Sequence, residues 1–353
     1  MATMALELTD PEELTVAARQ IPFPAGILQN WLPAVTRRDH RYLFRRSARS
    51  LRRAIPFRPW NTPAVPLDRG EVNEVSGRML PLSGILWLLE EESQLLDAAR
   101  AAGDEDAIAQ VFDQDLLTLT RGALQRIMLA QGEAIWSGKV TVGTQSAPEN
   151  RLQLGSVDFG LPAQNFITAS TLWNASTPDV FGQLDALTTT YKTTTGSEVM
   201  PGVVIMSTRI KNVLLKDPDF RNLLGSLLGA PPSIGTAQLR QLFADRELPR
   251  LIVDDTAVPN HNGVMTRQIP DDRIVILPEM PSQGGQAVGQ TQWGTTEEAK
   301  KLVRAQALGE ENAPGLVAVA MESENPVHTG TLVSGIAMPV VTDPDLIMSV
   351  KVL

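Results

Sequence analysis

The longest regular pattern of apolar and polar residues runs from Asp104 to Ser137. Apolar side chains recur there every three or four residues, the spacing that places them on one face of an α-helix. They are Ile108, Phe112, Leu116, Leu119, Ala123, Ile127, Ala130 and Ala134. Gly103 before the pattern, Asp104 at its start and Gly138 after it are typical terminating and capping residues. The pattern predicts one spine helix over 104–137, about 50 Å long at about 1.5 Å per residue.

Shorter patterns precede this helix. Residues 11–19 and 85–100 have the periodicity of amphipathic helices. Between them, the proline-rich stretch 54–82 predicts a two-stranded hairpin in which 64–67 pairs with 71–75 across the turn Asp68-Arg69-Gly70. Because an isolated hairpin is marginal in water, we expect this one to lie on another surface. The apolar residues of 21–33, which include Phe23 and Trp31, show no periodicity and predict an extended arm that another surface, such as another subunit, must cover.

Strands and helices alternate through the rest of the chain, which indicates a small mixed α/β domain. The helix after residue 176 is expected to begin with Thr177 as its N-cap and Pro178 in its first turn. The other predicted helices cover 208–215, 217–228 and 236–242. The predicted strands cover 139–142, 152–159, 203–206, 250–254, 273–277, 316–322, 329–338 and 345–353.

Arginine is concentrated between residues 37 and 58, where nine arginines face Asp39 alone. This segment carries +8 and the rest of the chain −17. Such a segment is typical of contact with a polyanion or an acidic protein, but a solvated arm that pairs with acids on a neighbouring surface has the same composition. No nucleic-acid motif accompanies the arginines. The candidate contact residues are Arg45, Arg46, Arg49, Arg52 and Arg53.

Residues that could carry chemistry are few. The chain has no cysteine, which excludes disulfides and thiolate chemistry. Its three histidines lie far apart, and the glycines at 284–289 match no phosphate-binding spacing. Adjacent acids at two predicted strand ends could hold a divalent cation in an enzyme, although such acids are usually solvated turns. They are Asp254, Asp255, Asp271 and Asp272. We expect no enzymatic activity, no cofactor, no export signal and no membrane span.

Several stretches then resemble one family. They are RIVILPEM with the following QWGTTEEA, LTRGALQRIMLAQGEAIWSGKV, and the C-terminal ESENPVHTGTLVSGIAMPVVTDPDLIMSVKVL. Together with the order of elements, they resemble the major capsid proteins of tailed bacteriophages, whose fold is shared with encapsulin shells. The resemblance implies an α+β capsid fold with four parts. These are an N-terminal arm (1–53), an extended β-hairpin loop (54–82), a peripheral domain with the spine helix (83–176 and 311–342), and an axial mixed α/β domain (177–310 and 343–353).

The resemblance also implies a function. The chain is expected to assemble into hexamers and pentamers that form the icosahedral shell around viral DNA, in the host cytoplasm first and then in the virion. The expected partners are a separate scaffolding protein, a portal protein and weakly held double-stranded DNA; a decoration protein stays an open question. The implied subunit-interface residues are Phe23, Trp31, Phe57, Trp60, Val72 and Val75.

Some relatives join a lysine of the extended loop to an asparagine of a neighbour. The first lysine of this chain is Lys139, so the sequence predicts no such crosslink. Two alternative functions remain at this point. One is an encapsulin-type compartment, against which the proline-rich and arginine-rich N-terminal segment argues, and the other is a metal-dependent enzyme that uses the four aspartates named above.

Overall fold

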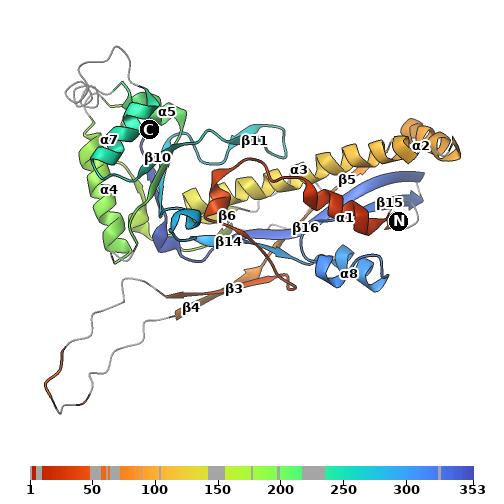
Figure 1. The fold of residues 1–353 in the computed structure, drawn as a ribbon, viewed down its shortest axis with the longest axis horizontal. Coiled ribbons are helices and arrows are strands. Elements are labelled where there is room, and N and C mark those ends of the chain that lie inside the picture. Colours follow the sequence, from red (N-terminus) through yellow and green to blue (C-terminus); the bar gives the residue numbers. More distant parts are fainter. Residues whose placement is uncertain are drawn as a thin grey trace.

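We describe the protein from a computed structural model. The described residues are 2–4, 10–47, 57–60, 63, 72–88, 90–102, 105–141, 156–175, 178–196, 199–216, 235–324 and 327–353. Figure 1 shows an elongated molecule in which one long helix, α3, runs along a sheet, with a second α/β layer at one end and a two-stranded ribbon leaving the body. No helix in the described ranges is long and apolar enough to span a membrane.

The larger sheet has six strands around β16. They are β1 (Ala2–Met4), β15 (Val317–Glu324), β16 (Val327–Val341), β14 (Gly289–Gly294), β2 (Ala34–Thr36) and β5 (Leu80–Trp87). β5 pairs with residues 330–337 of β16, a range that overlaps the pairings of both β15 and β14. β15 and β14 therefore follow one another along one side of β16, and β5 lies along the other. This central position explains the length of β16.

The spine helix is confirmed as α3, Glu105–Ser137, and the expected cap at Asp104 lies outside the described residues. Leu116, Leu124 and Ile127 pack against Val333 and Ala337 of β16. The helix ends at Gly138, whose positive φ of 70° is a conformation that favours glycine. On the opposite face of the sheet, α8 (Glu297–Arg304) covers β15.

The second sheet has five strands, and the sequence predicted most of them. They are β10 (Arg250–Val253), β9 (Val203–Met206), β13 (Arg273–Leu277), β17 (Met348–Lys351) and β8 (Phe166–Thr168). Alternate residues of β9 enter different cores: Val203 and Ile205 pack with Ile135 of α3, whereas Val204 and Met206 face the helices on the other side. Both faces are covered at this strand, which explains why β9 is apolar throughout.

The helices that cover this sheet are α4 (Val180–Thr194), α5 (Thr208–Leu214) and α7 (Thr236–Asp245). The expected Thr177 cap of α4 is wrong, because Asp179 is the N-cap and accepts a hydrogen bond from Gly182 N at 2.9 Å. The predicted helix at 217–228 lies outside the described residues. Two short hairpins complete this half of the chain, β6 (Lys139–Thr141) with β7 (Ser156–Asp158) and β11 (Ala257–Pro259) with β12 (Met265–Arg267).

Gly132 of α3 lies directly against the main chain of Gln268. A Cβ atom there would lie 2.0 Å from the main-chain oxygen of Gln268. The Gln268 side chain also donates to the main-chain oxygen of Met128 in α3 at 3.2 Å. The spine helix is thus joined directly to the segment that leads into β13.

Near the ribbon, one prediction cannot be compared with the described residues and one is wrong. The strand after residue 71, β4 (Val72–Arg78), pairs with β3 (Arg41–Ser47), and its predicted partner 64–67 lies outside the described residues. In addition, 85–87 belong to β5, and the helix that follows is α2 (Glu90–Ala102). Pairing with β16 decides this second case, because apolar residues in a short run suit a buried strand as well as a helix.

Candidate functional site

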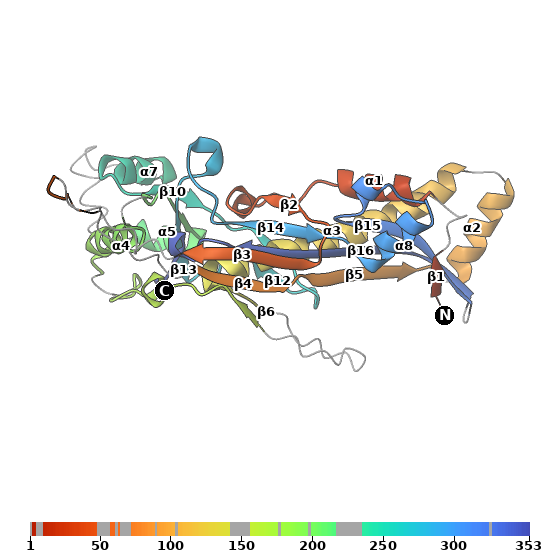
Figure 2. The same ribbon diagram turned by 90° about the horizontal axis from the view of Figure 1, so that it is seen from below.

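The ribbon of β3 and β4 carries exposed aromatic side chains beyond its end. Phe57 and Trp60 have exposed fractions of 105% and 96%, so nothing in their own chain covers them. Figures 1 and 2 both place residues 57–60 beyond one end of the body. Two predicted interface residues, Val72 and Val75, lie on β4, and their side chains are outside the described part of the structure.

The base of the ribbon is fixed to the body. Tyr42 of β3 is 4% exposed and belongs to the main core, as does Met79 just after β4. Burial raises the pKa of the Tyr42 hydroxyl. Gly77 lies opposite Tyr42, and a Cβ atom at Gly77 would overlap the tyrosine ring. The ribbon therefore leaves the body from a packed anchor.

The structure places two of the candidate arginines and leaves three undescribed. Arg45 and Arg46 lie on β3 opposite Glu74 and Asn73 of β4. Arg49, Arg52 and Arg53 lie outside the described residues. The backbone thus shows that part of the basic segment belongs to the projecting ribbon, which the sequence-based boundary at residue 53 had assigned to the arm.

The N-terminal helix α1 (Pro11–Gln20) is attached to β15 by specific hydrogen bonds. The Thr15 hydroxyl donates to the main-chain oxygen of Ala318 at 3.3 Å and accepts from Ala318 N at 3.2 Å. Farther along β15, β1 pairs with Met321, Glu322 and Ser323. The N-terminal residues thereby cover the edge of β15 that would otherwise be open.

Arg19 strengthens the same attachment. Its guanidinium donates to the main-chain oxygens of Leu316 and Pro314, each at 3.0 Å, and also to that of Asn312. Sequence reasoning missed Arg19 and Thr15, because a single arginine at the end of a short amphipathic helix has no pattern that names its partner.

The expectation that another subunit covers Trp31 is wrong. Trp31 is fully buried in its own chain and donates from Nε1 to the main-chain oxygen of Pro278 at 2.9 Å. It follows the 3₁₀ helix η1 (Ile27–Asn30), whose Leu28 is also fully buried. Phe23 is half-buried and packs against the core below α1. The non-periodic N-terminal stretch is therefore part of the core, held there by tertiary contacts.

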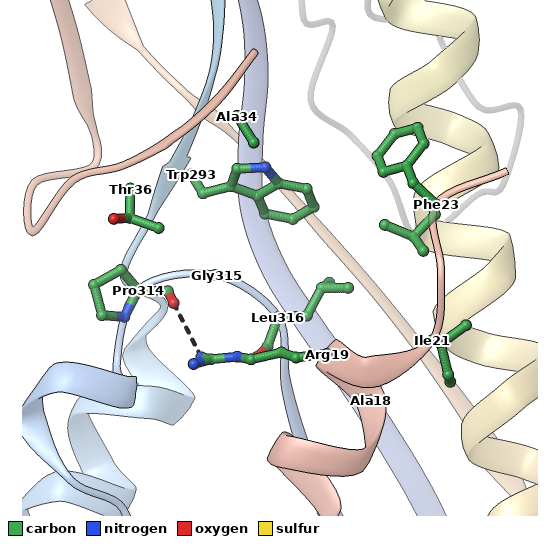
Figure 3. Close-up of a pocket in the computed structure, with 11 residues that line it drawn as sticks. Ala18, Arg19, Ile21, Phe23, Ala34, Thr36, Trp293, Pro314, Gly315 and Leu316 are labelled. Carbon is green, nitrogen blue, oxygen red and sulfur yellow. Dashed lines mark hydrogen bonds between the residues drawn. The ribbon is translucent and has the colours of Figure 1, made fainter. Parts of the chain in front are cut away.

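An open pocket of about 340 Å³ lies between this N-terminal stretch and the larger sheet. Figure 3 shows Trp293 and Leu316 on one wall, Ile21 and Phe23 on the wall next to α3, and Arg19 at its base. The pocket is also lined by Ala18, Ala34, Thr36, Leu124, Pro314 and Gly315. Its lining is mainly apolar, so an apolar side chain would be stabilised there.

The four aspartates considered as cation ligands contact other groups. Asp271 pairs with Arg209 at 3.1 Å, Asp272 pairs with Lys351 at 3.4 Å, and the Thr256 hydroxyl donates to Asp254 at 2.5 Å. Asp255 pairs with Arg267. Within the described ranges, no group of three or more potential ligands could hold a metal ion.

Burial is the largest single influence and acts to raise the pKa of Asp255, but several opposing interactions together outweigh it and lower the pKa. Thr208 donates to Asp255, its backbone N at 3.0 Å, and Arg267 adds a hydrogen bond and a positive charge. Together they lower the pKa of Asp255 to about 2. Asp255 thus has a structural role, because it connects Thr208 of α5 with Arg267 of β12.

The family comparison matches residues 10–352, nearly the entire chain, to "Phage major capsid protein E". The chain belongs to this family. It is accordingly a structural, non-enzymatic protein of the virion capsid, and the expected resemblance is confirmed. The enzyme alternative is therefore wrong.

Solved structures show the same fold. A prophage protein from E. coli CFT073, described as a capsid protein, has a TM-score of 0.61 and 14% identity over 100% of both chains. A phage-related protein from Bordetella bronchiseptica RB50 has a TM-score of 0.55 and 12% identity over 96% of both. No curated protein sequence matches. The α+β capsid fold is thus shared although little sequence is.

Proposed function

We propose that the protein assembles through hexamers and pentamers into the icosahedral shell that encloses phage DNA. The observation that carries this proposal is the ribbon, anchored at Tyr42, whose Phe57 and Trp60 are completely exposed in the single chain. Large exposed aromatic side chains are costly in water and are typical of surfaces that become buried on association. Because the chain belongs to a phage major capsid protein family, we expect this association to be the assembly of capsid subunits.

The proposed parts follow the predicted boundaries with one change. The spine helix with 83–176 and 311–342 forms the peripheral domain, and 177–310 with 343–353 forms the axial domain around the symmetry axes. We place β3 with the extended loop, because it pairs with β4 along its full length. The N-terminal arm then comprises the residues before Arg41.

The arginine-rich segment is proposed to contact an acidic scaffolding protein, a neighbouring subunit or packaged DNA. Its charge of +8 against −17 elsewhere favours contact with acidic groups of the same protein or of the scaffold. Any contact with DNA is confined to this patch and is weak. A portal protein would complete the shell.

Negative-stain microscopy of the purified protein, alone and with a coexpressed scaffold, tests the proposal. Closed shells with six- and five-fold capsomers are the expected result. A monomer that forms no rings, tubes or shells under either condition would contradict it. Heating assembled shells in detergent should release only single chains, because the ribbon lacks lysine; covalent ladders on a gel would show that a crosslink forms by another route.

A further inference from the structure

Two exposed apolar features lie at different places on the molecule. One is the pair of uncovered aromatics on the projecting loop, Phe57 and Trp60. The other is the open apolar pocket beside α1. Both views of the fold place residues 57–60 and α1 toward opposite ends of the molecule, so residues 57–60 of a chain do not lie over its own pocket.

We propose that the aromatic segment formed by residues 57–60 of one subunit docks into the pocket beside α1 of a second copy. The inference rests on the proposed assembly and names the two surfaces that meet. The pocket volume of about 340 Å³ lies at the lower end of the range that holds small organic groups, which suits one aromatic side chain. Trp293 and Phe23 in the lining supply aromatic contacts for it.

Charge complementarity supports this occupant. Glu12, Glu310 and Glu311 are exposed beside Asn312, which accepts from the pocket residue Arg19 and donates to Glu12. The incoming segment carries Arg58 between its two aromatics and continues the basic stretch of the ribbon. A basic aromatic segment therefore meets an apolar pocket with an acidic border.

The symmetry of the contact agrees with a shell. The loop and the pocket are different surfaces, so their contact is head-to-tail, and such contacts close into rings when the rotation between subunits allows it. A contact of identical patches would instead stop at a dimer. The proposed contact can therefore repeat around a capsomer.

The absence of cysteine allows a direct test. Chains with Pro59→Cys and tagged chains with Thr36→Cys are coassembled, because Thr36 is exposed at the pocket and Pro59→Cys leaves Phe57 and Trp60 in place. Mild oxidation should yield a disulfide-linked dimer of mixed mass in shells and none in unassembled protein, since a disulfide needs Cα atoms within about 7 Å. The control pairs Pro59→Cys with Met200→Cys, an exposed position outside the pocket lining, and should give no such band.

Loss of the mixed dimer in shells seen intact by microscopy would overturn the inference and leave the proposed function standing. Failure of the wild-type protein to form shells would instead remove the proposed function. If the cysteine chains fail to assemble, hydrogen exchange of wild-type shells against unassembled protein decides the question. Protection of residues 21–36 and 312–316 on assembly is expected, and unchanged exchange in both segments would overturn the docking.

Discussion

Arg19 shows how much of the N-terminal attachment depends on one side chain. It donates to three main-chain oxygens of the segment that enters β15, and its partners are carbonyl groups that no other described side chain reaches at these distances. Arg19→Met should leave these acceptors unpaired and lower the free energy of unfolding by about 1–3 kcal/mol. Urea unfolding of unassembled protein measures this.

The matched control for Arg19 is Arg304→Met, because Arg304 is exposed on α8 and donates no hydrogen bond in the described structure. It should change stability by less than about 0.5 kcal/mol. The stability change of Arg19→Lys should lie between those of Arg19→Met and Arg304→Met, since an ammonium group cannot reproduce the planar arrangement of guanidinium donors. Equal stability of the methionine variants would contradict the role given to Arg19.

Asp255 should make the free energy of unfolding depend on pH, and the direction of this dependence follows from its lowered pKa. Its pKa is lowered from 3.8 to about 2 in the folded protein, so the ionised carboxylate stabilises the fold above about pH 4. This contribution is lost as the pH falls toward about 2. Because the side chain is 44% exposed, screening limits the effect to about 1 kcal/mol or less.

The variant Asp255→Asn isolates this effect. The variant should be less stable than the wild type at neutral pH, and the difference should shrink as the pH falls below about 4. Thermal unfolding across this pH range measures it. A difference that stays constant with pH would mean that the charge of Asp255 does not contribute.

At the scale of elements, two glycines of α3 should respond in opposite ways. Gly132 touches the main chain of Gln268, whereas a Cβ atom at the exposed Gly122 would meet nothing within 4 Å. Gly132→Ala should destabilise by about 1–3 kcal/mol because the helix must move away. Gly122→Ala should stabilise by about 0.5–1 kcal/mol because alanine loses less backbone entropy in a helix.

Chemical unfolding of the two glycine variants supplies the comparison, with each serving as the control for the other in one helix. The effects should have opposite signs. If Gly132→Ala leaves the free energy of unfolding unchanged, then α3 and the segment before β13 can move apart without destabilising the protein. That result would argue against a rigid contact between them.

At the scale of the whole molecule, the asymmetric charge should govern assembly. Replacing Arg45, Arg46, Arg52 and Arg53 by glutamate should impair shell formation if the segment contacts the scaffold or a neighbouring subunit. Normal empty shells with a loss of packaged DNA would identify DNA as the target instead. The control reverses four exposed cations elsewhere, Lys216, Arg240, Lys301 and Arg304, for the same change in net charge. Counting full and empty particles by microscopy separates these outcomes.

The sequence by itself determined the elements whose pattern is long or whose environment is uniform. α3 is set by apolar spacing over many turns, and β9 and β13 by continuous apolar runs that suit strands covered on both faces. The family resemblance followed from the order of these elements. It predicted that Phe57 and Trp60 belong to an interface, which stays a prediction supported by their exposure.

Only the tertiary structure decided which segments meet. β4 pairs with β3 across a long connection, and pairing between distant segments leaves no local pattern in either. Trp31 is buried because Pro278, far along the chain, supplies its hydrogen-bond acceptor, and the pocket beside α1 exists only where Phe23 and Trp293 come together. Local periodicity reports which face of an element is apolar, but the partner that covers that face is chosen by packing of the whole chain.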